Sequence, residues 1–143
     1  MSLDPSPATR GERNCNPGNL EYSPATVWFG LDVPAADGRF CRFTDPLHGI
    51  RALAKTLVTY QNRDDCVTLA QIIHRWAPPA ENNTDAYLND VCQRTGMLAT
   101  SVPSLTSGST DLADVVTAII FHENGRCIYA PELIGQAAAL AVA

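Results

Sequence analysis

The segment Gly11-Glu12-Arg13-Asn14-Cys15-Asn16-Pro17-Gly18-Asn19-Leu20 is polar and turn-rich, yet it leads into a largely apolar chain. It carries one carboxylate, one guanidinium and three amides around a Pro-Gly turn, and only Cys15 and Leu20 are apolar. Burial therefore does not explain why the segment exists. We predict that it shapes a functional site, with Glu12 as the candidate catalytic acid.

Length and composition favour a single globular domain over residues 1–143, with residues 1–9 as a loose lead-in. The chain is 45% hydrophobic and 17% charged, which is typical of globular proteins. Its net charge of -5 offers no basic surface for nucleic acid. We find no signal-peptide pattern and no apolar run of membrane-spanning length, so we expect no membrane insertion.

The cysteine pattern favours free thiols. Five cysteines, with no CxxC spacing, fit neither a zinc site nor a complete disulfide framework. We therefore expect reduced, mostly buried thiols and neither a metal nor another cofactor. They are Cys15, Cys41, Cys66, Cys92 and Cys127.

Periodicity predicts a mainly helical α+β fold with a small hairpin. Residues 27–31 and 39–43 are rich in aromatic and β-branched side chains, and the turn signal at 34–38 between them predicts a small β-hairpin or a three-stranded sheet. About five helices follow. They are expected from 46 after an Asp45 cap, over 67–76, from a Thr84 cap to 92, over 112–122 as the buried central helix, and over 132–142.

Several strings resemble known families. The spacing from Glu12 to Asn19 is similar to the Glu-Ser-x-x-Asn-Pro-x-Ala stretch of soluble lytic transglycosylases, which are related to goose-type lysozymes. A closer resemblance is to phage and prophage lysozyme-like proteins with an Arg-Gly-x-Arg-Asn-Asn-Asn-Pro-x-Asn-Ile signature. The matching strings lie at residues 10–20, 28–30, 49–52 and 75–84. This resemblance implies a lysozyme-like fold that acts on peptidoglycan.

The resemblance also implies a reaction, which is cleavage of the β-1,4 bond between N-acetylmuramic acid and N-acetylglucosamine. Glu12 would protonate the leaving oxygen. A lytic transglycosylase needs no second carboxylate, whereas a hydrolase would use a helper such as Glu21 or Asp45. The chain departs from the signature at Cys15, where the relatives have Asn.

The string at 75–84 joins a helix end, a Pro-Pro turn and a helix start, and it gathers polar and aromatic side chains at one corner. Such side chains stack on sugar faces and bond hydroxyls and acetamides. A simple capped helix junction would explain the same residues. The candidate glycan-binding residues are Asn16, Asn19, Trp28, Trp76, Glu81, Asn82 and Tyr87.

Glu123 is the second candidate acid. It follows His122 at the expected C-terminal end of the central helix, where the helix dipole disfavours a carboxylate. A residue in an unfavourable place can have a functional reason. A solvated helix end that stops at Gly125 is the plainer explanation.

Two other functions fit the sequence. One is a phage or prophage virion protein that binds peptidoglycan without cleaving it and has other virion proteins as partners. A cysteine hydrolase that pairs Cys15 with His48 or His122 is a third idea. In each phage case we expect synthesis in the bacterial cytoplasm, or packaging in the virion, and action at the periplasmic cell wall.

Overall fold

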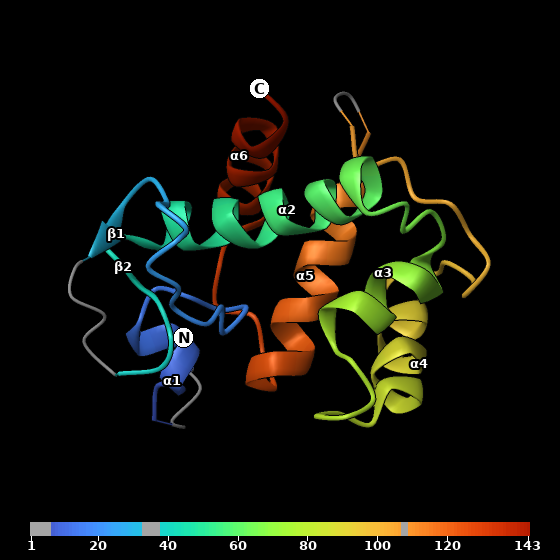
Figure 1. Ribbon diagram of the computed structural model, residues 1–143, viewed down its shortest axis with the longest axis horizontal. Coiled ribbons are helices and arrows are strands. Elements are labelled where there is room, and N and C mark those ends of the chain that lie inside the picture. Colours follow the sequence, from blue (N-terminus) through green and yellow to red (C-terminus); the bar gives the residue numbers. More distant parts are fainter. Residues whose placement is uncertain (1–6, 33–37, 107–108) are drawn as a thin grey trace.

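The structure is a computed structural model that describes residues 7–32, 38–106 and 109–143. It is a mainly helical α+β protein with a small antiparallel sheet at one side (Figure 1), so the predicted fold class is confirmed. Five helices of the described residues correspond to predicted ones, and α1 is an additional single turn. The helices are α1 (Arg10–Arg13), α2 (Pro46–Arg63), α3 (Leu69–Trp76), α4 (Thr84–Thr95), α5 (Asp111–Asn124) and α6 (Pro131–Val142); the strands are β1 (Leu31–Asp32) and β2 (Arg42–Phe43).

Local signals set most helix ends. The Asp45 side chain accepts a hydrogen bond of 3.0 Å from the backbone N–H of His48, and Pro46 occupies the first position of α2, as predicted. Helix α5 ends at Gly125, whose φ of 73° lies in the left-handed region. The predicted cap of α4 was wrong by one residue, because Asn83 caps it and Thr84 instead donates to the carbonyl of Ala77.

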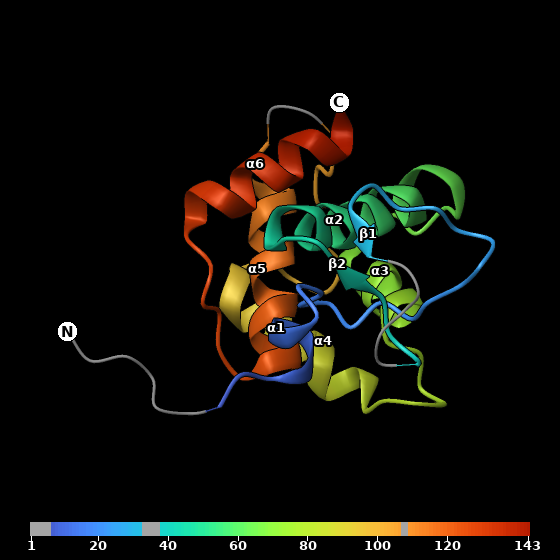
Figure 2. The ribbon, with the colours of Figure 1, turned by 90° about the vertical axis from the view of Figure 1, so that its left-hand side faces the viewer.

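The core is built around α5, which is the buried central helix that the apolar run predicted. It contacts α2, α4, α6 and α1. Helix α2 lies across α5, α6 crosses and packs against α2, and α3 and α4 lie on the side away from the sheet (Figures 1 and 2). Burying each large apolar side chain contributes about 1.5–3 kcal/mol. Fully buried members include Ile50, Leu53, Leu57, Ile72, Ile73, Val91, Val115, Ile119 and Ile120.

The sheet is smaller than the sequence suggested. Strand β1 pairs with β2 through Leu31 opposite Phe43, and residues 27–30 are irregular, so the predicted strand at 27–31 was wrong over most of its length. The chain turns at Gly30, which has a φ of 74° and packs so closely that a Cβ there would lie 2.3 Å from Cγ of His48. The predicted turn at 34–37 lies outside the described residues.

The N-terminal segment is fastened to the start of α2. A Cβ on Gly49 would lie 1.7 Å from the carbonyl oxygen of Cys15, so only glycine permits this approach. The backbone N–H of Phe43 donates to the carbonyl of Asn14 at 2.9 Å. These contacts bring the polar segment beside the sheet and over the helical body.

The structure bears on the expectations for the cysteines, for a membrane span and for a metal site. All five cysteines are free, but only Cys41 is buried and the other four are half-buried. No helix among the described residues is long and apolar enough to span a bilayer. In the same residues, no cluster of three or more His, Cys, Asp or Glu side chains is arranged to hold a metal ion.

Candidate functional site

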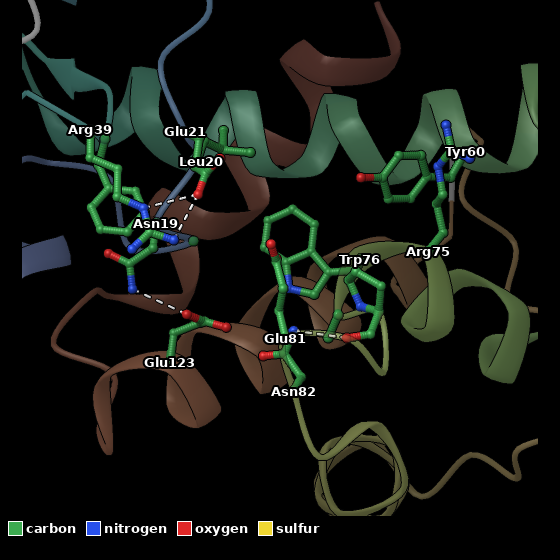
Figure 3. A pocket seen from close by; sticks show the side chains of 14 residues that line it. Asn19, Leu20, Glu21, Arg39, Tyr60, Arg75, Trp76, Glu81, Asn82 and Glu123 are labelled. Carbon is green, nitrogen blue, oxygen red and sulfur yellow. Dashed lines mark hydrogen bonds and ion pairs between the residues drawn. The ribbon is translucent and has the colours of Figure 1, made fainter.

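A polar cleft of about 440 Å³ lies between the N-terminal segment and the α3–α4 connection (Figure 3). One wall comes from the loop after α1 and the residues that lead into β2. The other wall comes from the end of α2, the end of α3 and the turn into α4. The lining residues are Gly18, Asn19, Leu20, Glu21, Arg39, Phe40, Tyr60, Arg75, Trp76, Ala77, Pro78, Glu81, Asn82 and Glu123.

Glu123 is the carboxylate that α5 contributes to this cleft. Its Oε1 accepts a hydrogen bond of 3.1 Å from Nδ2 of Asn19, and its Oε2 accepts one of 2.7 Å from the Tyr87 hydroxyl. The Tyr87 oxygen in turn accepts a hydrogen bond of 2.9 Å from the indole N–H of Trp76. Burial, and next the charge of Glu123, raise the pKa of Tyr87 far above its ordinary value, so its hydroxyl remains a donor. Glu123 is therefore held in place by both walls.

Asn16 builds the first wall from behind. It is fully buried, and its amide nitrogen donates to the carbonyls of Leu20 and Cys41 while its oxygen accepts from the Leu20 N–H. These bonds use the amide completely, so Asn16 shapes the loop and is not available to a ligand. Asn19 lies at the bend with a φ of 52°, which Asn tolerates better than most residues, and its side chain points to Glu123.

Trp76 forms the second wall. Its ring end lies against the loop, where a Cβ on Gly18 would come within 3.2 Å of the ring. Glu81 and Asn82 extend this wall along the turn into α4, and both are exposed. The predicted corner at 75–84 is thus real, and it contributes an indole, an amide and a carboxylate to one face of the cleft.

Each wall also carries an ion pair. Arg39 donates to Oε1 of Glu21 at 2.8 and 3.0 Å, with side chains about 60% exposed. Arg75 lies 3.3 Å from Asp64 and is also exposed. Exposed pairs of this kind contribute little to stability. Each guanidinium group also lies over an aromatic ring of the cleft, Arg39 over Phe40 and Arg75 over Tyr60.

Glu12, the leading sequence candidate, does not line the cleft. Its side chain is only 3% exposed, and Arg126 binds it at 2.6 and 2.9 Å. Its Oε1 also accepts from the backbone N–H of Thr9, which completes a capping box on α1. The structure thus places Glu12 in a buried ion pair that fixes the N-terminal segment.

The other predicted site residues divide between the cleft and its support. Glu21, Asn19, Trp76, Glu81, Asn82 and the second candidate acid, Glu123, all line the cleft. Tyr87 is buried behind it and reaches Glu123 through its hydroxyl. Trp28 is half-buried against the small cluster of Cys41, Phe43 and Ala52.

The structure gives no support for a cysteine hydrolase. Burial, followed by the charge of Asp45, raises the pKa of the Cys15 thiol, whereas a nucleophilic cysteine needs a lowered one. His48 is bonded to Asp45 at 2.8 Å, and His122 to Asp90 at 2.7 Å. Among the described residues, neither imidazole is hydrogen-bonded to the Cys15 thiol.

Sequence reasoning missed several lining residues. Arg39 and Phe40 were assigned only to a strand, and Tyr60 only to the helix that became α2. Arg75 had a signal, because it precedes Trp76 in the 75–84 string. Tyr60 had none, since a tyrosine near a helix end is common and only the packing of α2 beside α3 brings it to the cleft.

The fold and this cleft define a mainly helical α+β protein with a polar cleft that is lined by Glu21, Glu81 and Glu123. The chain is 36% identical over 124 residues to Protein P5 of Pseudoalteromonas phage PM2, covering 85% of this chain and 75% of that protein. It matches no protein-family model. The chain belongs to the family of this phage protein.

Proposed function

We propose that this chain cleaves peptidoglycan at the β-1,4 bond between N-acetylmuramic acid and N-acetylglucosamine, with Glu123 as the general acid. The observation that carries the proposal is the position of the Glu123 carboxylate in the cleft, bonded to Asn19 of one wall and Tyr87 behind the other. A glycosidase needs a carboxyl group fixed next to the scissile oxygen. Glu12 is enclosed by Arg126 and lies outside the cleft.

The position of Glu123 differs from the resemblance, which puts the acid at Glu12, and shares with it only a helix end. In the lytic transglycosylases that the N-terminal strings resemble, the acid sits at the end of a helix that enters a small sheet. Here Glu123 lies in the last turn of α5, and its partner Asn19 belongs to the loop that leads to the sheet. The acid position is therefore supplied by the central helix instead of by the N-terminal segment.

The walls suit a glycan strand. Trp76 offers an aromatic ring for a sugar face, and the amides of Asn19 and Asn82 can bond hydroxyl or acetamide groups. Arg39 and Arg75 can meet the carboxylates of the lactyl group or stem peptide. Membership in a phage protein family supports an encounter with bacterial cell wall.

Two routes remain for the second half of the reaction. In a transglycosylase, Glu123 alone would assist closure of a 1,6-anhydro ring. In a hydrolase, a second carboxylate would position water, and Glu21 is the predicted helper that lines the same cleft. Glu21 pairs with Arg39 at 2.8 Å in the same wall of the cleft. We favour the transglycosylase route because it needs one acid.

The test is digestion of purified Gram-negative sacculi, with released muropeptides identified by mass spectrometry. We expect Glu123→Gln to lower the rate by roughly 10²–10⁴-fold. Glu132→Gln, on the exposed side of α6, is the matched control and should retain activity. Products ending in 1,6-anhydromuramic acid would identify a transglycosylase, and reducing ends a hydrolase. Full activity in Glu123→Gln would refute the assignment of the acid.

A second candidate function is glycan binding without cleavage. It is favoured by the hydrogen bonds that Asn19 and Tyr87 donate to the two oxygens of Glu123, because both oxygens then serve as acceptors and neither is directed at a leaving oxygen. Sacculi that sediment with the wild-type protein but release no muropeptide would support this function and overturn the enzymatic one.

A further inference from the structure

A line of hydrogen bonds runs from the wall of the cleft to Glu123. The indole N–H of Trp76 donates to the Tyr87 oxygen at 2.9 Å, and the Tyr87 hydroxyl donates to Oε2 of Glu123 at 2.7 Å. The three side chains come from α3, α4 and α5, which pack together. Tyr87 is 2% exposed, so water does not compete with these bonds.

The direction of this line is fixed by chemistry. An indole nitrogen can only donate, so the Tyr87 oxygen must accept from Trp76. A phenol has a single proton, and Tyr87 must then direct it to Glu123. Oε2 of Glu123 is consequently the acceptor of the Tyr87 proton in this arrangement, and a proton on the neutral carboxyl group then belongs on Oε1.

We infer that Tyr87 is a positioning residue that leaves Oε1 of Glu123 as the oxygen that carries the transferable proton, with Trp76 setting the direction of the Tyr87 hydroxyl. This inference rests on the proposed function for its catalytic meaning. The hydrogen-bond geometry behind it stands independently of whether the chain cleaves glycan.

Asn19 is the adaptable partner on the other oxygen. Its Nδ2 donates to Oε1 of Glu123, while its own Oδ1 is buried with no hydrogen-bond partner among the described residues. That Oδ1 lies by Gly11, where a Cβ would be 3.1 Å from it and 2.9 Å from the oxygens of Asn16 and Asn124. A flipped amide would accept the Oε1 proton and turn its nitrogen toward those oxygens. The unpartnered Oδ1 thus fits a site whose Oε1 alternates between acceptor and donor.

Other ionisable groups surround this line and stay unchanged in the test. The His122 ring packs on Tyr87 with centroids 3.8 Å apart, and His122 pairs with Asp90, which also binds Arg94. The charged groups that line the cleft with Glu123 are Glu21, Arg39, Arg75 and Glu81.

The experiment compares Tyr87→Phe with the wild type, using soluble uncrosslinked glycan strands and a ¹³C NMR titration of the Glu123 carboxyl carbon, assigned with Glu123→Gln. Tyr129→Phe is the matched control, since it removes a buried hydroxyl that has no partner among the described residues and lies outside the cleft lining. Trp76→Phe is a second variant that keeps Tyr87 but frees its hydroxyl.

For Tyr87→Phe we expect kcat to fall about 10- to 100-fold, with KM within about twofold, because the acid is less well aligned. Loss of the donor favours the protonated carboxyl group, so the basic limb of the pH profile and the NMR inflection should both move up by about one pH unit. Trp76→Phe should move the inflection in the same direction by less, and Tyr129→Phe should leave it in place.

An unchanged inflection in folded Tyr87→Phe would overturn the inference, as would an unchanged kcat in an active enzyme. If Tyr87→Phe does not fold, the Trp76→Phe titration decides in the same way. A wild-type protein that releases no muropeptide would overturn the proposed function. The NMR comparison would still decide whether Tyr87 holds Oε2, so the two failures are distinguishable.

Discussion

Oε1 of Glu12 lies 2.6 Å from Nη2 of Arg126, in an ion pair whose carboxylate is 3% exposed and whose guanidinium is 18% exposed. The pair joins α1 to the segment after α5. It therefore fastens the loop that carries Asn19 to the helix that carries Glu123. The carboxylate that stands out most in the sequence stabilises the site, and a less conspicuous one occupies the cleft.

Breaking this pair should destabilise the fold. Glu12→Gln removes the buried carboxylate that Arg126 binds at 2.6 Å, and we expect a loss of about 3 kcal/mol in the free energy of unfolding, measured by urea denaturation. Replacing both residues, as Glu12→Gln with Arg126→Met, should restore part of that loss because no uncompensated charge remains. Unchanged stability combined with lost glycan cleavage would contradict the structural role and return Glu12 to catalysis.

The contact between Gly49 and the Cys15 carbonyl should make Gly49→Ala strongly destabilising. The added methyl group would overlap backbone atoms, which cannot rotate away, so we expect a loss of about 3 kcal/mol or more. Gly135→Ala is the matched control in α6, where a Cβ meets nothing within 4 Å. It should stabilise by about 0.5–1 kcal/mol, the usual gain of Ala over Gly in a helix. Equal melting temperatures for the two variants would refute the close approach.

Asp45 should contribute to the acid sensitivity of the fold. The backbone N–H of His48, which donates to it, holds the pKa of this carboxyl below its ordinary value of 3.8. A carboxyl with a lowered folded-state pKa stabilises fully above that ordinary value, and the contribution is lost as the pH falls through the lowered one. Asp45→Asn keeps a capping side chain but does not titrate, so its stability should vary less with pH below about 4. Parallel acid-unfolding curves for the two proteins would contradict this.

Glycan binding should change the fluorescence of Trp76 and not that of Trp28. The chain has two tryptophans; Trp76 lines the cleft and Trp28 packs on the small cluster near the sheet. In Trp28→Phe, titration with an N-acetylglucosamine tetramer should change the emission, because a sugar face would cover the remaining indole. In Trp76→Phe, the same titration should leave the Trp28 emission unchanged. A response only from Trp28 would move the binding site out of this cleft.

Much of the helical framework could be predicted from local patterns. Each of these patterns acts within a few residues along the chain. They are the apolar spacing of α2, α3 and α5, the Asp45 cap, the Pro-Pro stop after Trp76 and the helix end at Gly125. The irregular path of residues 27–30 could not be predicted, because their aromatic composition favours a strand while the close packing of Gly30 on His48 forces a turn. The contact that decided the outcome lies in another element.

The sequence by itself determined which residues are polar amid an apolar chain, and so it identified both the 75–84 corner and the importance of the segment around Glu12. Only the tertiary structure decided which carboxylate faces the cleft. A glutamate's role depends on the groups that surround it in space, and Arg126 and Tyr87 reach Glu12 and Glu123 from 114 and 36 residues away along the chain. Charge pairing and burial at such separations leave no local pattern, so packing alone assigned the two glutamates their places.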